Sequence, residues 1–301
     1  MKLCYQVATP DVAIADSVTA YQGPLDKTFG DIAAYGYDGV ELMTIDPGKL
    51  NWEQVRRTAQ DLGLVVGLVC TGEIFGQLGL SFADPDPARR AEAVARVKDI
   101  IDFAASQDAK VNIGRVRGQY RPGVARQQTE EWAVEAFQAI SDYAAPKNVM
   151  IALENVTIMQ TNFVNTMAEA KRMVDMTNRP NFKAMMDVFH MNIEEKDMYQ
   201  AIRDYADINV HVHLSDNNRR YPGNCGMDFP KVIQTFHDVG YDDLFCTEIF
   251  QDPSMEESAK RSIAYLAPIF EKIYASPAST RCTVSSSPLA SSCGRESPGT
   301  F

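Results

Sequence analysis

The sequence predicts a single (β/α)₈ barrel of the α/β class. Eight short apolar runs alternate with amphipathic helical segments over the first 275 residues, which is the pattern of repeated βα units. These runs begin 26 to 45 residues apart, close to the ~30 residues of one βαβ unit. Eight units favour closure into a barrel, a fold of about 250 residues. An open doubly wound sheet would need a glycine-rich phosphate turn after an early strand, and the sequence has none.

The elements follow one another in chain order. The predicted strands are residues 3–8, 39–43, 65–70, 110–114, 150–154, 182–187, 208–214 and 244–250. The clearest helical segments are residues 52–62, 88–105, 130–143, 167–176 and 199–205. The longest connection, residues 71–87, carries several apolar side chains that can pack, so we expect it to cover an active site.

The domain is predicted to span residues 1–275. The remaining segment, residues 276–301, is rich in Ser and Pro and shows no helical or strand periodicity. We expect it to be a disordered tail or an expression artefact without a functional role.

Composition narrows the class of protein. A content of 45% apolar and 23% charged residues is ordinary for a globular domain, and no run reaches the ~18 apolar residues of a membrane span. The start of the chain does not resemble a signal peptide, and the six cysteines form no CxxC pair, so we expect a cytoplasmic protein. The net charge of −11 argues against a nucleic-acid partner. We expect a homo-oligomer, which is common among such barrels.

The last four predicted strands each end near a residue that can bind a metal ion. Because active sites of these barrels lie where strands end, these residues are expected to converge. They are Glu154, Asp187, His213 and Glu248.

Strand parity points these side chains into the barrel. In the fifth strand Ala152 and Glu154 share one face, while Ile151 and Leu153 share the other. The aliphatic face suits packing against the outer helices, so the ionisable face points inward. In the seventh strand His211 lies on the same face as His213, and we expect it to be a core histidine one layer below.

A cluster of buried carboxylates requires a compensating charge. Three carboxylates and one imidazole form a mostly hard oxygen set, which favours Mn²⁺, with Mg²⁺ or Co²⁺ as alternatives, over a structural zinc ion. A single acidic residue at a strand end is more often a helix N-cap or an ion-pair partner. Four consecutive strands ending this way favour one divalent metal site.

Three segments resemble a known family. DVFHMNIEE (187–195), HVHLSDNNRRYPG (211–223) and TEIF (247–250) resemble the xylose-isomerase-like sugar isomerases and epimerases. Within that superfamily the chain resembles the ketose 3-epimerases of the D-tagatose 3-epimerase type and, more closely, 5-keto-L-gluconate epimerase. The similarity extends from residue 1 to about residue 275 and includes GLSFADPDPARR and the RVRG of residues 115–118.

The resemblance implies roles for individual residues. Glu154 and Glu248 would be both metal ligands and the acid/base pair. His190 and Arg219 would bind substrate oxygens. Arg117 and Glu73 are also expected among the substrate contacts.

The segment after Glu154 departs from the family pattern. Epimerases typically continue with Pro-x-Asn-Arg-x-Glu, whereas this chain has residues 155–160 as NVTIMQ. Ile158 and Gln160 therefore stand where the family has Arg and Glu, which predicts a more apolar pocket. NCGMDF (224–229) also differs from the usual Gly-x-Gly-His/Ile-Asp-Phe.

The predicted reaction is epimerisation of a keto-sugar or keto-sugar acid. One glutamate would remove a proton from the substrate to form a metal-stabilised cis-enediolate. The other would return a proton to the opposite face. A lyase or dehydratase acting through the same enolate is the alternative, and a non-catalytic sugar-binding protein or an endonuclease IV type enzyme is less favoured. The sequence is compatible with both free and phosphorylated sugar substrates, because four arginines can bind a phosphate or a carboxylate. They are Arg115, Arg117, Arg219 and Arg220.

Overall fold

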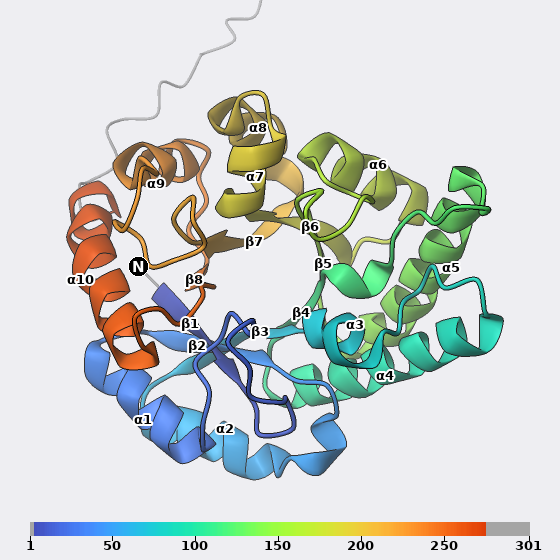
Figure 1. The fold of residues 1–301 in the computed structure, drawn as a ribbon. Helices are drawn as coiled ribbons and strands as arrows, with labels where there is room; N and C mark the ends of the chain where they lie inside the picture. The colour runs from blue at the N-terminus through green and yellow to red at the C-terminus, as the bar shows by residue number, and fades with distance from the viewer. Residues whose placement is uncertain (1–2, 275–301) are drawn as a thin grey trace, which may run out of the picture.

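The protein is a closed barrel of eight parallel strands surrounded by helices (Figure 1). The computed structural model describes residues 3–274. Neighbouring strands pair in chain order, and β1 closes the barrel against β8, where Leu3 lies opposite Phe245. The predicted fold class is confirmed. The expectation for residues 276–301 lies outside the described residues.

The observed strands agree closely with the predicted ones. They are β1 (Leu3–Ala8), β2 (Gly39–Met43), β3 (Val65–Cys70), β4 (Lys110–Ile113), β5 (Ile151–Glu154), β6 (Phe182–Asp187), β7 (Asn209–Leu214) and β8 (Phe245–Thr247). The main difference is in the last strand, which was predicted to include residues 244–250. Glu248 therefore follows the last strand, and its backbone N–H still donates to the carbonyl of Leu214 on β7.

The helices form a ring outside the strands (Figure 1). The α-helices are α1 (Leu25–Tyr35), α2 (Trp52–Asp61), α3 (Gly72–Leu78), α4 (Pro87–Ser106), α5 (Arg126–Ala144), α6 (Met167–Thr177), α7 (Val188–Glu194), α8 (Met198–Asp204), α9 (Phe229–Asp238) and α10 (Met255–Tyr274). The 3₁₀ turns are η1 (Pro47–Lys49), η2 (Arg115–Arg117), η3 (Ala145–Lys147) and η4 (Ala206–Ile208). Within residues 3–274, no helix combines the length and the apolarity that crossing a membrane requires.

The core divides into an inner and an outer cluster, as strand parity predicts. On β5, Ala152 packs inside the barrel with Met185 of β6. The alternate residues Ile151 and Leu153 belong to the large cluster between strands and helices. The inward face of β5 is therefore the one that carries Glu154, at the carboxyl end of the strand.

The predicted cover segment is partly helical. Residues 72–78 form α3, which packs against η2 at the end of β4. Ile74 is fully buried on this helix. This packing holds the segment above the carboxyl end of the barrel, where it forms part of the site described next.

Candidate active site

Three of the four predicted ligands, Glu154, Asp187 and Glu248, converge on the Nδ1 atom of the fourth, His213. This atom lies 2.7 Å from Glu248 Oε2, 3.2 Å from Glu154 Oε1 and 3.5 Å from Asp187 Oδ2. All four residues are buried, and the two glutamates keep a small exposed fraction of 6% and 8%. The glutamates are therefore the members of the cluster that a solute in the cavity can reach.

Asp187 is both a helix cap and a member of the cluster. Its Oδ1 atom accepts the backbone N–H of Phe189, at 2.9 Å, at the start of α7. Its Oδ2 atom faces His213 and accepts a hydrogen bond from Arg219 Nη1 at 2.7 Å. Helix capping and metal binding are alternative predictions for such a residue from the sequence. In Asp187 the oxygen that caps α7 and the oxygen that faces the cluster are different atoms of one carboxylate.

Each glutamate is oriented by a separate donor. Asn112 Nδ2 of β4 donates to Glu154 Oε2 at 3.0 Å, and Thr19 Oγ1 donates to Glu248 Oε1 at 2.9 Å. Gly114 is needed beside Glu154, because a Cβ atom there would lie 2.8 Å from Glu154 Oε2. One oxygen of each carboxylate is thus fixed while the other faces His213.

A fourth carboxylate, Glu41 of β2, lies below the cluster. It is fully buried and accepts hydrogen bonds from Gln6 Nε2 at 2.7 Å and from His211 Nε2 at 2.9 Å. Its Oε2 atom also lies 3.0 Å from His213 Nε2. Glu41 therefore holds the nitrogen of His213 that faces away from the other ligands.

Glu41 is not among the site residues predicted from the sequence, although the sequence carries a signal for it. Glu41 stands in the apolar run GVELM on a predicted strand, where an ionisable residue is unusual. Strand parity predicts the inward-facing ionisable residues of the last four strands. The same parity argument, applied to the second strand, points Glu41 into the barrel. His211 lies one layer below His213, as predicted, and its partner is Glu41.

Arg219 inserts a positive charge into the cluster. Its guanidinium group donates to Asp187 and to Glu248 and lies 5.0 Å from the ring centroid of Phe189. Its backbone has a φ of 59°, in the left-handed region. This turn is fixed by Asp216, whose carboxylate accepts four backbone N–H groups, those of residues 217, 223, 225 and 227.

Burial and opposite charges compete in setting the pKa values of the cluster. Burial disfavours the charged form of His213, but Glu41 and Glu248 raise its pKa well above the ordinary value. Burial likewise opposes ionisation of Glu248, but Arg219 and His213 lower its pKa. The surrounding carboxylates therefore favour the protonated form of His213 when no metal ion is bound.

These residues line a cavity of about 250 Å³ at the carboxyl end of the strands. Its wall consists of Ser17, Thr19, Met43, Cys70, Gly72, Glu73, Gly114, Arg115, Glu154, Val156, Gln160, His190, Arg219, Glu248 and Phe250. Three of the predicted substrate contacts are therefore present, Glu73, His190 and Arg219. His190 is buried, and its Nδ1 atom has no hydrogen-bond partner within the described residues.

Arg117 does not reach this cavity, contrary to expectation. It is fully buried and donates to the backbone carbonyls of Gly114, Phe163 and Val164 at 2.7 to 2.9 Å. All its guanidinium nitrogens are occupied by these bonds. Arg117 ties η2 to the loop after β5, and Arg115, two residues earlier, lines the cavity in its place.

The departure after Glu154 changes the cavity less than predicted. Ile158 is 56% exposed and is not part of the wall, whereas Gln160 is. The backbone N–H of Ile158 donates to Glu194 of α7, which turns this stretch outward. The expected apolar lining at position 158 is therefore wrong.

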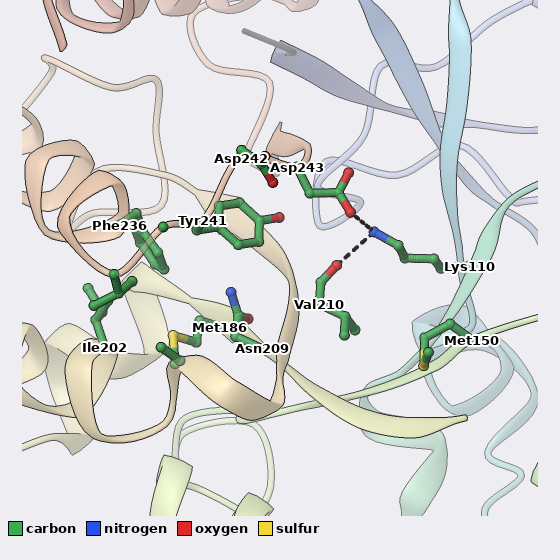
Figure 2. Close-up of a pocket in the computed structure, with 13 residues that line it drawn as sticks. Lys110, Met150, Met186, Ile202, Asn209, Val210, Phe236, Tyr241, Asp242 and Asp243 are labelled. Carbon is green, nitrogen blue, oxygen red and sulfur yellow. Dashed lines mark hydrogen bonds and ion pairs between the residues drawn. The ribbon is translucent and has the colours of Figure 1, made fainter. Parts of the chain in front are cut away.

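A second hollow, of about 420 Å³, lies at the opposite end of the barrel (Figure 2). It adjoins the first residues of β4 and β7, Lys110 and Asn209. Lys110 there donates to the carbonyl of Val210 and pairs with Asp243 (Figure 2). None of the predicted site residues lines this hollow, so the candidate active site is the cavity at the carboxyl end.

The donor set of the cavity suits a divalent cation. One ligand atom from each of Glu154, Asp187, His213 and Glu248 lies within 4.8 Å of the others. Opposite ligands in an octahedral site with bonds of about 2.1 Å lie about 4.2 Å apart, so small side-chain shifts close the shell. Three oxygens and one imidazole nitrogen favour ions such as Mn²⁺, Mg²⁺ or Co²⁺.

Comparison with known proteins shows the family to which this barrel belongs. Residues 29–269 match the family described as the xylose isomerase-like TIM barrel, and the chain belongs to that family. It is 30% identical over 222 residues to L-ribulose 3-epimerase of Methylomonas sp. (strain DH-1), covering 71% of this chain and 74% of the relative. It is 26% identical to 3-dehydro-D-guloside 4-epimerase of Escherichia coli (strain K12), covering 71% and 83%.

Solved structures agree on the fold. The crystal structure of 3-keto-D-glucoside 4-epimerase from E. coli superposes with a TM-score of 0.74 at 23% identity, covering 89% of this chain and 99% of that one. A structure of L-ribulose 3-epimerase gives a TM-score of 0.76 at 21% identity, covering 90% and 95%. The curated relatives above are epimerases, and the chain is accordingly an enzyme of the isomerase class.

Proposed function

We propose that this protein is a divalent-metal-dependent epimerase of a keto-sugar or keto-sugar acid. Glu154 and Glu248 are the two proton-transferring bases. The family membership and the epimerase relatives support the reaction type. The arrangement of the two glutamates supports their roles.

The single observation that carries the proposal is the placement of the two glutamates, of which Glu248 alone also accepts a hydrogen bond from Arg219. They come from β5 and from the residue after β8, three strands apart around the barrel. Each faces His213 Nδ1 with one oxygen and is held by a neutral donor, Asn112 or Thr19, through the other. Two fixed carboxylates at the ends of separate strands can approach one carbon atom from different sides.

Inverting a carbon centre requires such a pair. One carboxylate removes the proton from the carbon next to the carbonyl group, and the other delivers a proton to the opposite face. A single short side chain held by Asn112 or Thr19 cannot reach both faces of a bound substrate. When bound by Glu154, Asp187, His213 and Glu248, a divalent cation would supply Lewis-acid stabilisation of the negative charge on substrate oxygens.

The surrounding polar groups would position the substrate. His190, Arg219 and Glu73 line the cavity and can hydrogen-bond to carbonyl and hydroxyl oxygens. Arg117 is left out of this set because its donors are used by backbone carbonyls. It supports the cavity wall instead.

The test is hydrogen exchange in D₂O. With Mn²⁺ and a panel of ketoses, keto-acids and keto-glycosides, the protein should incorporate one deuterium at the epimerised carbon. Glu154→Gln and Glu248→Gln should each lower turnover by about 10²–10⁴-fold. Glu131→Gln, an exposed carboxylate on α5, is the matched control and should keep full activity.

Two outcomes would contradict the proposal. A glutamine variant that turns over at the wild-type rate would remove that glutamate from the pair. A product lighter than its substrate by water or by an aglycone would identify elimination in place of epimerisation.

Three further expectations belong to the same proposal. We infer that Mn²⁺ is the preferred ion, that the enzyme is cytoplasmic and that it acts as a homo-oligomer. The oxygen-rich ligand set supports Mn²⁺. The free thiols of Cys4, Cys70, Cys225 and Cys246 are compatible with a reducing compartment.

A further inference from the structure

An ion pair on the cavity wall has no part in the proton transfers described above. Glu73 of α3 and Arg115 of η2 both line the cavity that contains Glu154 and Glu248. Arg115 Nη2 lies 2.7 Å from Glu73 Oε1. The side chain of Glu73 is 10% exposed and that of Arg115 is 30% exposed. The pair is therefore largely removed from bulk water and open to the cavity.

The helix carrying Glu73 is shaped around this pair. A Cβ atom at Gly76 would lie 2.7 Å from Glu73 Oε2, 2.9 Å from Glu73 Oε1 and 2.8 Å from Arg115 Nη2. All three distances are shorter than real contacts allow, so the pair packs directly against the backbone of α3 at a glycine. The absence of a side chain at Gly76 therefore leaves room for both charged groups to lie together against α3.

The pair leaves hydrogen-bonding capacity facing the cavity. Within residues 3–274, Arg115 makes one side-chain hydrogen bond, through Nη2, although a guanidinium group has five N–H donors. Glu73 can accept further hydrogen bonds at Oε2. A hydroxyl group both donates and accepts, so sugar hydroxyls match this wall.

An anionic group does not match it. The cavity wall contains two arginines, and the charge of each is already paired with carboxylates, Arg115 with Glu73 and Arg219 with Asp187 and Glu248. A carboxylate or phosphate beside Arg115 would lie next to the Glu73 carboxylate as well. Binding it would either bring two negative charges together or separate Glu73 from Arg115, and both are costly.

We propose that the Glu73–Arg115 pair determines substrate specificity by binding hydroxyl groups at the end of the substrate that lies against α3 and η2 and by excluding carboxylate and phosphate groups there. This inference rests on the proposed function for its substrate. It narrows the keto-sugar or keto-sugar acid to substrates that are neutral at that end.

The experiment compares three ligands that differ only in one terminal group, which is neutral in the first ligand and anionic in the other two. They are the best neutral ketose of the panel, its terminal phosphate ester and its terminal carboxylate analogue. Binding to the Mn²⁺-loaded protein is measured by calorimetry, and kcat/KM is measured by deuterium incorporation. Wild-type protein should favour the neutral ketose by about tenfold or more in both measurements, as expected for a built-in unfavourable charge contact.

Three variants test the pair. Glu73→Gln frees Arg115 and should shift the ratio of neutral to anionic ligand by about tenfold toward the anions. Gly76→Ala keeps both charges but displaces them, and should raise KM for the neutral ketose with less effect on kcat. Glu92→Gln, an exposed carboxylate on α4, changes the net charge equally and should leave the ratio unchanged.

The outcomes separate the two proposals. Wild-type preference for an anionic ligand, or an unmoved ratio in a folded Glu73→Gln protein, overturns the role of the pair. The expected binding ratios without deuterium incorporation would sustain that role and overturn the epimerase proposal. Circular dichroism and thermal melting establish that each variant is folded.

Discussion

Glu41 and His213 are joined inside the barrel by a contact of 3.0 Å between Glu41 Oε2 and His213 Nε2. This contact connects β2 to β7 across the barrel interior and leaves Nδ1 of the same ring facing Glu154, Asp187 and Glu248. A carboxylate that accepts from one ring nitrogen fixes the ring orientation and makes the other nitrogen a better ligand.

Replacement of Glu41 should weaken metal binding. Glu41→Gln keeps the shape of the side chain but removes the negative charge beside His213, so we expect a loss of about 10–100-fold in affinity for Mn²⁺. Equilibrium titration of the ion measures this directly. Glu53→Gln, an exposed change on α2, should leave the affinity unaltered, and an equal affinity in Glu41→Gln would show that the contact does not tune His213.

Metal binding should release a proton near neutral pH. The pKa of His213 is raised in the metal-free protein, so the ring is protonated at pH 7, and its Nδ1 must lose a proton to bind an ion. Affinity should therefore rise as the pH rises toward that pKa and level off above it. Calorimetry in buffers with different ionisation enthalpies counts the protons released, and a count of zero at pH 7 contradicts the assignment of Nδ1 as a ligand.

Loss of either donor to the glutamates should reduce kcat more than it changes KM. Asn112→Ala removes the hydrogen bond to Glu154, and Thr19→Val removes the one to Glu248. Glu154 would then sample orientations that do not reach the substrate, and we expect kcat of Asn112→Ala to fall about tenfold or more. Glu248 keeps its hydrogen bond from Arg219, so the fall in kcat of Thr19→Val should be smaller. Steady-state kinetics with Mn²⁺ at saturation separates this effect from metal loss, and a change confined to KM would indicate substrate contact instead.

Arg117 should matter for stability. Arg117→Met removes three hydrogen bonds from a charged donor to backbone carbonyls. The carbonyls of Gly114 and Val164 keep a backbone N–H donor, whereas that of Phe163 loses its one partner within residues 3–274. We expect the free energy of unfolding to fall by about 3–5 kcal/mol. Arg126→Met, at an exposed position on α5, should change it by less than about 1 kcal/mol, and denaturant titration of both variants makes the comparison.

The fold and the convergence of Glu154, Asp187, His213 and Glu248 were predictable because both depend on a periodic pattern in the sequence. Strand parity placed Ala152 inside and Ile151 outside the barrel, and it aimed Glu154 and His213 at one point. These arguments need only the alternation of side chains along a strand. The arguments do not depend on the conformation of the loops.

The details of the wall could not be derived in this way. Arg115 and Arg117 are two residues apart in a 3₁₀ turn, and no periodicity in the sequence says which one faces the cavity. Ile158 turns outward because its backbone bonds to Glu194, a contact 36 residues away in the chain. Such choices depend on tertiary partners that the local sequence does not specify.

The divided role of Asp187 has a consequence for any attempt to redesign this site. One oxygen caps α7 and the other faces His213 and Arg219, so the start of the helix and the proposed metal site share a single side chain. A substitution at Asp187 will therefore move unfolding and metal affinity together, whereas Glu154 and Glu248 can be exchanged with the helices left as they are.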